Sequence, residues 1–288
     1  MYAIYTDTSA NLPDMIVQKY GLQVIPLHYT VNGITYPTSD DGANAFDGKL
    51  YYDFMRKGAS VKTSMINTSA FSTAFARSLS NGTDVVYVGM SSGISGSHHA
   101  AEVAAAELRE QYPDRKIAII DTRAASLGEG LPVLFAARLK DAGESIDEVV
   151  LKTEKNSASI CQYFTVEDLM YLKKGGRISG AAAIVGNILQ VKPILKGDEE
   201  GKIVLCQKER GRKRAMEALV SKYRELASDL GAPIGIAHAD CGEDAGYLAK
   251  RIHESGHSGE ILMECYEPVT GSHVGPGTIA LFFYGVHR

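Results

Sequence analysis

Two runs of apolar residues, DVVYVGM at 84–90 and KIAIIDT at 116–122, constrain the fold of this chain more than any other feature. Each run has the length of a strand, and a helix-like segment at 98–112 separates them. Apolar runs of this kind are typical of parallel strands whose two faces are both covered by helices. A short apolar run at 2–6 and a helix expected at 131–143 extend the alternation. The first half of the chain is therefore predicted to be α/β with a parallel sheet.

The second half of the chain has a different order of elements. The segment at 199–211 fits a hairpin, and two strands joined only by a hairpin are antiparallel. A mixed or antiparallel sheet is expected here. The length of 288 residues suits two domains. We place the boundary near residue 155, between an α/β domain with hydroxyl-rich ligand loops (1–155) and an α/β domain with the mixed or antiparallel sheet (156–288).

Composition and charge exclude several classes of protein. The net charge of −4 lacks the basic excess of a general nucleic-acid binder. The four cysteines form no CxxC pair and HExxH is absent, so no metal site is predicted. The first residues do not resemble a signal peptide, and no apolar run reaches the roughly 18 residues of a membrane span. A reduced, cytoplasmic protein is expected.

Hydroxyl side chains gather where predicted strands or helices meet, in TDTS at 6–9, KTS at 62–64 and SSGISGS at 91–97. Ligands of open α/β sheets bind beyond the carboxyl ends of the strands, and helix N-termini favour anions. Each cluster alone is explained by helix capping, because Ser and Thr are preferred caps. The three clusters together favour contact with an anionic ligand.

The segment GMSSG at 89–93 follows a predicted strand and precedes a helix, and it has the G-x-S-x-G pattern. This is the context of a hydrolase nucleophile, so a serine hydrolase with Ser91 as nucleophile and His273 as base is the alternative function. His273 lies in a glycine-rich approach to a strand, where it is equally suited to donating to an anion or to capping a turn. A small polar-ligand sensor without a catalytic cycle is a third hypothesis. Neither GxGxxG nor a Walker loop is present.

A basic segment, KKGGRISG at 173–180, closes a predicted short helix. Cations at a helix C-terminus interact favourably with the helix dipole, which is one explanation of this segment. Arg177 is instead expected to be exposed near a turn, where it would face an anionic group or an acidic partner. Lone buried cations are costly, which argues against a buried position for Arg177.

Together these motifs resemble the DegV family of fatty-acid-binding proteins. The matching stretches are TDTSANLP, KTS, SSGISGS, DTRAASLGEG, FTVEDLMYLKKGGRISGAAAIVGNILQVKPIL and HVGPGTIALFFYG, in order from residue 6 to residue 285. The chain departs from the family at Met65 and Ile66, where Gln-Pro is usual, and at His98 and His99, where Tyr-Gln is usual. The opening TDT replaces the commoner TDS.

The resemblance implies two α/β domains, one with a mainly parallel and one with a largely antiparallel sheet, and a lipid between them. A long-chain fatty acid such as palmitate, stearate or oleate would lie in an apolar tunnel. The resemblance further implies the carboxylate-binding residues, which would be Thr63, Ser64, His273 and a serine of the 91–97 loop. That serine is Ser92 or a near neighbour, either Ser91 or Ser95.

The same resemblance implies a role as the lipid-carrying, non-catalytic subunit of a bacterial fatty acid kinase. An ATP-dependent kinase subunit would supply ATP and metal, and Arg177 would face this partner. No cofactor, no nucleic acid and at most transient membrane contact are then expected. The lack of a nucleotide-binding loop is consistent with this arrangement, because the partner would bind the nucleotide.

Overall fold

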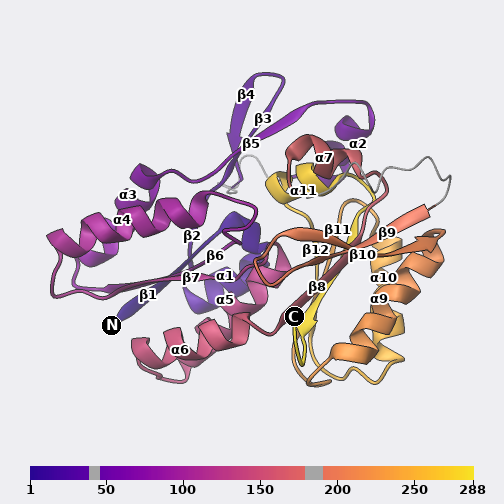
Figure 1. Cartoon of the computed structure of the whole chain (residues 1–288). Coiled ribbons are helices and arrows are strands. Elements are labelled where there is room, and N and C mark those ends of the chain that lie inside the picture. Colours follow the sequence, from indigo (N-terminus) through magenta and orange to yellow (C-terminus); the bar gives the residue numbers. More distant parts are fainter. Residues whose placement is uncertain (39–45, 179–190) are drawn as a thin grey trace.

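Four parallel strands form the sheet of the first lobe, in the order β2–β1–β6–β7. The computed structural model describes residues 1–38, 46–178 and 191–288. Helices α3 and α4 cover one face of this sheet, and α1, α5 and α6 cover the other (Figure 1). The bounds are β1 (Tyr2–Asp7), β2 (Gln23–Ile25), β6 (Asp84–Gly89), β7 (Ile117–Asp121), α1 (Asp14–Tyr20), α3 (Thr68–Leu79), α4 (Ser97–Gln111), α5 (Leu127–Asp141) and α6 (Ile146–Ser157).

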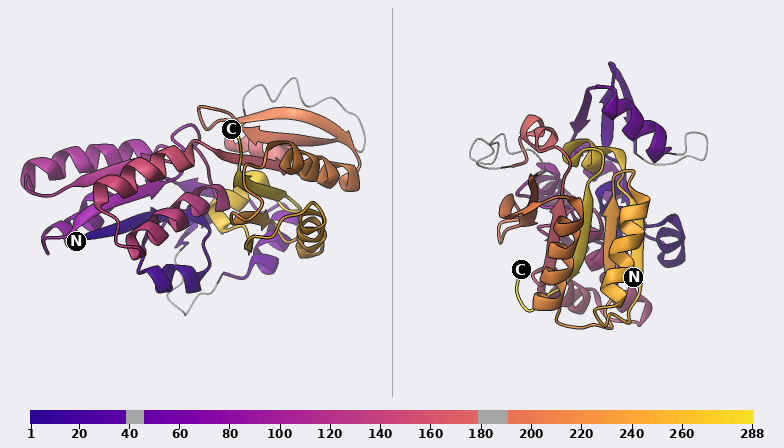
Figure 2. Two further views of the ribbon diagram at one scale, coloured as in Figure 1. Left: turned by 90° about the horizontal axis from the view of Figure 1, so that it is seen from below. Right: turned by 90° about the vertical axis from the view of Figure 1, so that its right-hand side faces the viewer.

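Six strands form the sheet of the second lobe, in the order β10–β9–β8–β13–β11–β12. All neighbours are antiparallel except β11 and β12. Helices α9 and α10 cover one face, and the other face is turned toward α5 of the first lobe (Figure 2). The bounds are β8 (Ile160–Thr165), β9 (Val191–Gly197), β10 (Ile203–Arg210), β11 (Ile234–His238), β12 (Ile261–Cys265), β13 (Ile279–Tyr284), α9 (Arg212–Leu226) and α10 (Gly242–His253).

A small antiparallel sheet, β4–β3–β5, and several short helices complete the described fold. Strands β3 and β4 are joined by a two-residue turn at Asn32 and Gly33, a pair of residues typical of hairpins: both have positive φ, 52° and 84°, as such a turn requires. The bounds are β3 (His28–Val31), β4 (Ile34–Pro37), β5 (Val61–Ser64), the 3-10 helix η1 (Thr8–Ala10), α2 (Gly48–Arg56), α7 (Met170–Gly175) and α11 (Pro268–Val274).

Helix α5 lies between the two large sheets. One side of the helix packs on the first sheet through Val133 and Ala137, and Leu127 and Leu131 face the second sheet. A helix that is apolar all round is expected in such a doubly buried position. Its first turn contains Gly128, where an added Cβ would lie 2.8 Å from Phe282 Cδ1. The helix therefore begins at Leu127, before the residue expected from the sequence, because its glycines allow this close approach.

The predicted α/β class, with one parallel and one largely antiparallel sheet, is confirmed. The domain boundary near residue 155 stays a proposal; α6 ends at Ser157, and β8 begins at Ile160 in the second sheet. The helix expected just before β9 falls within 179–190 and lies outside the described residues.

Two elements near the site, β5 and α11, have no counterpart among the elements expected from the sequence. A strand is expected at 260–269, which overlaps only Pro268 and Val269 of α11. The strand β12 ends at Cys265, and Glu267 then caps α11 by accepting hydrogen bonds from the backbone N–H groups of Val269 and Thr270 (both 2.5 Å). Pro268 occupies the first turn, where its missing N–H costs nothing.

The TDTS cluster binds a carboxylate of the protein itself. Thr6 Oγ1 donates to Glu129 Oε1 (3.1 Å), and Ser9 Oγ donates to the other carboxylate oxygen of Glu129. Asp7 accepts from the Tyr87 hydroxyl (2.5 Å). All of these groups are buried, and burial raises the pKa of both Glu129 and Asp7. The expectation that Thr6 and Ser9 contact a ligand is therefore wrong, because Glu129 uses both hydroxyls.

This buried carboxyl predicts a pH dependence of stability. The folded-state pKa of Glu129 lies above its ordinary value of 4.5, so the folded protein binds more protons and loses stability as pH rises above about 4.5. Glu129→Gln removes this loss. Between pH 5 and pH 8, we expect the unfolding free energy of the variant to rise relative to that of wild type.

Urea unfolding of both proteins at the two pH values measures this difference. Glu110→Gln, on the exposed side of α4, is the matched control and is expected to change the pH dependence little. A difference between Glu129→Gln and wild type that is the same at both pH values would contradict the prediction.

Candidate functional site

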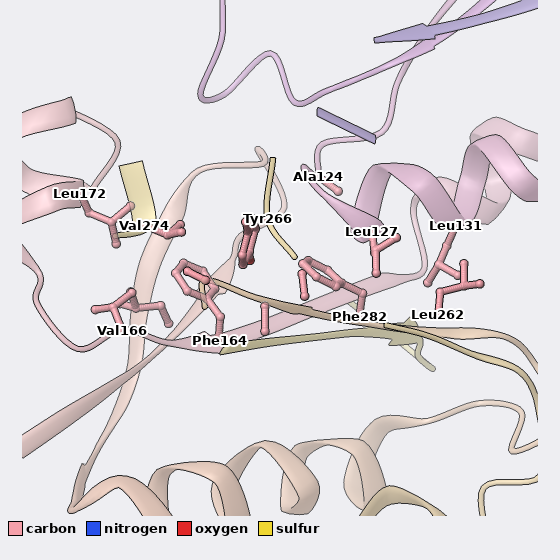
Figure 3. Packing of buried hydrophobic residues seen from close by; sticks show 14 of the residues in the cluster. Ala124, Leu127, Leu131, Phe164, Val166, Leu172, Leu262, Tyr266, Val274 and Phe282 are labelled. Carbon is pink, nitrogen blue, oxygen red and sulfur yellow. The ribbon is translucent and has the colours of Figure 1, made fainter. Parts of the chain in front are cut away.

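A cavity lies between the two lobes and has walls from both. About 820 Å³ of space, open solvent included, lies among its lining residues. The second lobe contributes Phe164 and Phe282, and the first lobe contributes Met90, Ile94 and Ala125. Figure 3 shows Phe164, Tyr266 and Phe282 along the apolar wall, which continues the buried core between the lobes.

Polar side chains gather at one end of this cavity. Thr63 Oγ1 and His273 Nε2 form a hydrogen bond of 2.9 Å, and Ser95 and Arg177 line the cavity near them. We call these four residues the polar end. Thr63 comes from the edge strand β5 and His273 from the last turn of α11, so neither position depends on the parallel sheet.

The local packing holds the imidazole of His273 closely. A Cβ at Gly175, the last residue of α7, would overlap His273 Nδ1, so the end of α7 lies directly against the ring. Burial, together with the smaller effect of the positive charge of Arg177, lowers the pKa of His273 to about 4. His273 is therefore neutral at pH 7, and its hydrogen bond with Thr63 joins two uncharged groups.

Arg177 lies half-buried, and its guanidinium connects two segments. Nε donates to the carbonyl of Ile94 (3.1 Å), and Nη1 donates to the carbonyl of Gly175 (2.5 Å). Burial lowers its pKa below the ordinary value. The exposed position expected for Arg177 is therefore wrong, because the two carbonyls compensate the cost of burying the cation. The guanidinium charge thereby lies beside His273.

The structure separates the three candidate serines. Ser95 lines the cavity, and its hydroxyl bonds to the neighbouring Ser97. Ser91 is fully buried and donates to the carbonyl of Gly201 (2.8 Å). Ser92 is exposed and donates to Asp121 Oδ2 (2.6 Å). Neither Ser91 nor Ser92 lines the cavity, so among the three only Ser95 accompanies Thr63 and His273.

This geometry does not favour the hydrolase alternative. A nucleophile needs its base within hydrogen-bond reach. Ser91 donates to Gly201, and the described partner of His273 Nε2 is Thr63. Ser64, the remaining candidate, lines the cavity beside Thr63 but is largely exposed.

A second hollow adjoins the polar end on its outer side. It has Thr63, Arg177 and His273 in common with the apolar cavity, and about 1280 Å³ of space, open solvent included. Its other walls are more polar, and they include Lys62, Ser60, Asp168, Lys174 and Ser272. The polar end therefore lies between an apolar cavity and a polar, solvent-facing hollow.

Sequence reasoning missed two hydroxyls that line the apolar cavity. Thr270 Oγ1 and Ser126 Oγ are buried, and within the described parts of the chain neither has a hydrogen-bond partner. Thr270 precedes His273 by three residues on α11, which places the two on one helix face. Two features of the sequence could have identified Thr270. Pro268 is typical of a helix start, and Thr270 and His273 are three residues apart on that helix.

Residues 1–38, 46–178 and 191–288 contain no cluster of His, Cys, Asp or Glu suited to a metal ion. In the same residues, no helix is both long and apolar enough to cross a membrane.

Comparison with known proteins gives consistent matches along the whole chain. The family model that matches residues 1–286 is that of the DegV family, described as an uncharacterised protein family. A DegV domain-containing protein of Clostridium perfringens is 38% identical over 288 residues, covering 99% of this chain and 97% of that protein.

Solved structures match equally completely. A DegV family protein of Thermus thermophilus, described by its fatty acid binding, has a TM-score of 0.87 at 28% identity, with 99% of both chains covered. A fatty acid binding DegV family protein of Streptococcus agalactiae has a TM-score of 0.86 at 29% identity, with 98% of both chains covered.

The electrostatics of the polar end predict how the His273 ring titrates. We expect its imidazole to stay neutral until the pH falls to about 4, the pKa of the ring, because burial disfavours the cation. Arg177→Gln is expected to raise this pKa, because it removes the neighbouring positive charge. The pKa of His273 in the folded protein lies below its ordinary value of 6.5, so the unfolded chain binds a proton more readily. The free energy of unfolding therefore decreases as the pH falls from about 6.5 to 4.

NMR titration of the histidine ring protons in the ligand-free protein measures both values. The His273→Gln variant assigns the resonance by its disappearance. A His273 ring that titrates above pH 6 in wild type would contradict the burial described above.

Proposed function

This chain belongs to the DegV family, and from the cavity together with this membership we propose that it binds a long-chain fatty acid. One observation carries the proposal: an apolar cavity between two sheets that ends at the hydroxyls and imidazole of the polar end. The acyl chain, such as that of palmitate, stearate or oleate, would occupy the apolar part. The relatives of Thermus thermophilus and Streptococcus agalactiae, described as fatty-acid binding, support this choice of ligand.

The energetics suit such a ligand. Burying about 14 methylenes at ~0.8 kcal/mol each contributes roughly 11 kcal/mol before the costs of ordering the chain and the ligand. The carboxylate would accept hydrogen bonds from Thr63, Thr270 and Ser95, and hydrogen bonds to a charged acceptor are the strong ones. Arg177 lies nearby, but its guanidinium already donates to the carbonyls of Ile94 and Gly175.

The test is to identify and then to vary the ligand. We expect mass spectrometry of an extract from the denatured protein, or uptake of added palmitate or oleate, to show a bound fatty acid. Thr63→Ala combined with Ser95→Ala is expected to weaken binding, since a hydrogen bond to a charged group contributes roughly 1.5–3 kcal/mol. Titration calorimetry or displacement of a fluorescent fatty acid gives the affinities.

Two controls separate the headgroup contacts from packing. A fatty alcohol of equal length is expected to lose little affinity in the double variant. The hydroxyl of Ser92 contacts Asp121 outside the cavity, so Ser92→Ala is expected to leave the affinity for both ligands unchanged. Repeated absence of any fatty acid would contradict the proposed function, and equal losses for acid and alcohol would contradict the assignment of the carboxylate contacts.

We further propose that the chain is the non-catalytic, lipid-carrying subunit of a fatty acid kinase. A carboxylate at the polar end would face the polar hollow, so a partner docked there would reach it from outside. The partner subunit would supply ATP, and a carboxylate oxygen would attack its terminal phosphorus to form an acyl phosphate and ADP. Thr63 and His273 would only hold and orient the carboxylate.

This arrangement assigns Arg177 a role toward the partner, since it lines the hollow as well as the cavity. We expect Arg177→Ala to keep most fatty acid binding and to reduce the rate of acyl phosphate formation with an ATP-dependent kinase subunit. Lys173→Ala, at an exposed neighbouring position outside the hollow, is the matched control; its smaller effect is expected to fade with added salt.

Coupled ADP release measures the rate, and lipid content is measured on the same sample. Loss of lipid binding in Arg177→Ala would instead indicate that the hydrogen bond to the Ile94 carbonyl maintains the cavity. An unchanged rate with the cognate partner would contradict the assigned role.

A further inference from the structure

The helix α11 contributes Thr270 and His273 to the cavity, so its position decides where these two side chains lie. It has only seven residues, and it follows β12, the strand at one edge of the second sheet. A helix this short has little stability of its own in water. The position of α11 therefore depends on the contacts that other parts of the chain make with it.

Two tyrosines of α2 hold the backbone at the start of α11. The Tyr52 hydroxyl donates to the carbonyl of Tyr266 (2.9 Å), and the Tyr51 hydroxyl donates to the carbonyl of Pro268 (2.7 Å). Both donors are buried. These hydrogen bonds connect α2, from the N-terminal part of the chain, to the segment that leads from β12 into α11.

A third contact holds the residue between these two carbonyls. The backbone N–H of Glu267 donates to Asn11 Oδ1 (3.1 Å). Asn11 has a positive φ of 53°, which asparagine adopts more readily than most residues. Three consecutive residues at the start of α11 are thus each hydrogen-bonded to a side chain from the N-terminal part of the chain. We call Asn11, Tyr51 and Tyr52 the anchor residues.

The helix α11 also packs directly on one anchor residue. A Cβ at Gly271 would overlap the Tyr52 hydroxyl, so the absence of a side chain at Gly271 is what allows the close approach. Gly271 directly follows Thr270 on the helix. A change in the place of the Tyr52 hydroxyl therefore acts on the turn of α11 that carries Thr270.

The helix α2 also contacts α7, the other helix beside His273. The Tyr171 hydroxyl of α7 donates to the carbonyl of Met55 on α2 (3.3 Å), and Gly175 at the end of α7 lies against the His273 ring. In Figure 1, α11 lies beside both α2 and α7. The two helices that meet at His273 are therefore both held by α2.

From these contacts we propose that the anchor residues are positioning residues for carboxylate binding, because they hold α11 where Thr270 and His273 meet the headgroup. All three anchor residues lie outside the cavity lining, so they act through α11. The inference rests on the proposed function, because it assumes a carboxylate at the polar end. Hydrogen bonds weaken steeply when their geometry changes, whereas the apolar contacts of an acyl chain depend little on direction.

The experiment removes one anchoring hydroxyl and compares two ligands. Tyr52→Phe keeps the ring and is expected to lower the affinity for palmitate by about 3- to 10-fold, because a displaced α11 weakens the hydrogen bonds to the carboxylate. The affinity for a fatty alcohol of equal length is expected to change by less than about twofold. In the ligand-free variant, the His273 ring is expected to titrate at a higher pH, because a displaced ring is less buried.

Further variants make the result decisive. Tyr51→Phe covers the case in which Tyr52→Phe fails to fold, and Asn11→Gly removes the amide but keeps a residue that adopts positive φ. The same changes are expected in both. Tyr5→Phe is the matched control, because Tyr5 is buried and its hydroxyl donates to the carbonyl of Ala74 (2.9 Å) outside the cavity. It is expected to keep the wild-type affinities and the wild-type titration of His273.

The outcomes separate this inference from the proposed function. A wild-type protein that binds no fatty acid overturns both. If wild type binds palmitate, the inference alone is overturned when Tyr51→Phe and Tyr52→Phe weaken the acid and the alcohol equally or leave both unchanged. A His273 titration that matches wild type in both variants also overturns it, as does an equal loss of palmitate affinity in Tyr5→Phe.

Discussion

The close approach of helix α5 to both large sheets is the constraint on which the rest of this structure depends. An added Cβ at Gly130 would lie 2.5 Å from the carbonyl oxygen of Ala10, and one at Gly128 would lie 2.8 Å from Phe282. Opposite the helix, Gly235 on β11 leaves room for Leu127 in the same way. Glycine inside a helix costs about 1 kcal/mol relative to alanine. At Gly128 and Gly130 this cost is offset because the tight packing on both sides of α5 leaves no room for a Cβ. Because α5 fixes the spacing of the lobes, it also fixes the space between them.

Two kinds of buried polar group accompany this packing, and they differ in their hydrogen bonds. Glu129 on α5 accepts from Thr6 and Ser9, so its carboxyl is satisfied within the protein. In the cavity, the hydroxyls of Thr270 and Ser126 are buried without such partners among the described residues. A buried hydroxyl without a partner is costly, and a ligand that supplies an acceptor removes that cost. The difference explains why one hydroxyl cluster is structural and the other suits a ligand.

The cavity depends on contacts that cross between segments far apart in the chain. At the polar end, β5 supplies Thr63 and α11 supplies His273, which lie 210 residues apart. Between the lobes, Gln162 reaches Arg123, and Ser91 reaches the turn at Gly201. The apolar walls come from regular alternation on strands, as at Phe164 and Phe282. The specific chemistry of the site is therefore carried mainly by loops, short elements and single polar side chains.

By itself, the sequence determined the elements whose signal is local. Runs such as 84–90 and 116–122 indicated buried parallel strands, the Asn32–Gly33 pair is typical of a hairpin, and the family motifs indicated Thr63 and His273 among the candidate site residues. These patterns are local because strand periodicity and turn chemistry act over a few residues.

Only the tertiary structure decided which polar side chains face the cavity. Ser91, Ser92 and Ser95 lie in one loop with the same hydroxyl chemistry. The hydroxyls of Ser91 and Ser92 bond to Gly201 and Asp121, which are distant in the sequence, while Ser95 bonds to Ser97 of its own loop. Arg177 likewise lies half-buried because the carbonyls of Ile94 and Gly175 meet its guanidinium. The direction of a side chain in a loop depends on partners that are distant in the sequence, and those partners take their positions only when the two lobes pack on α5.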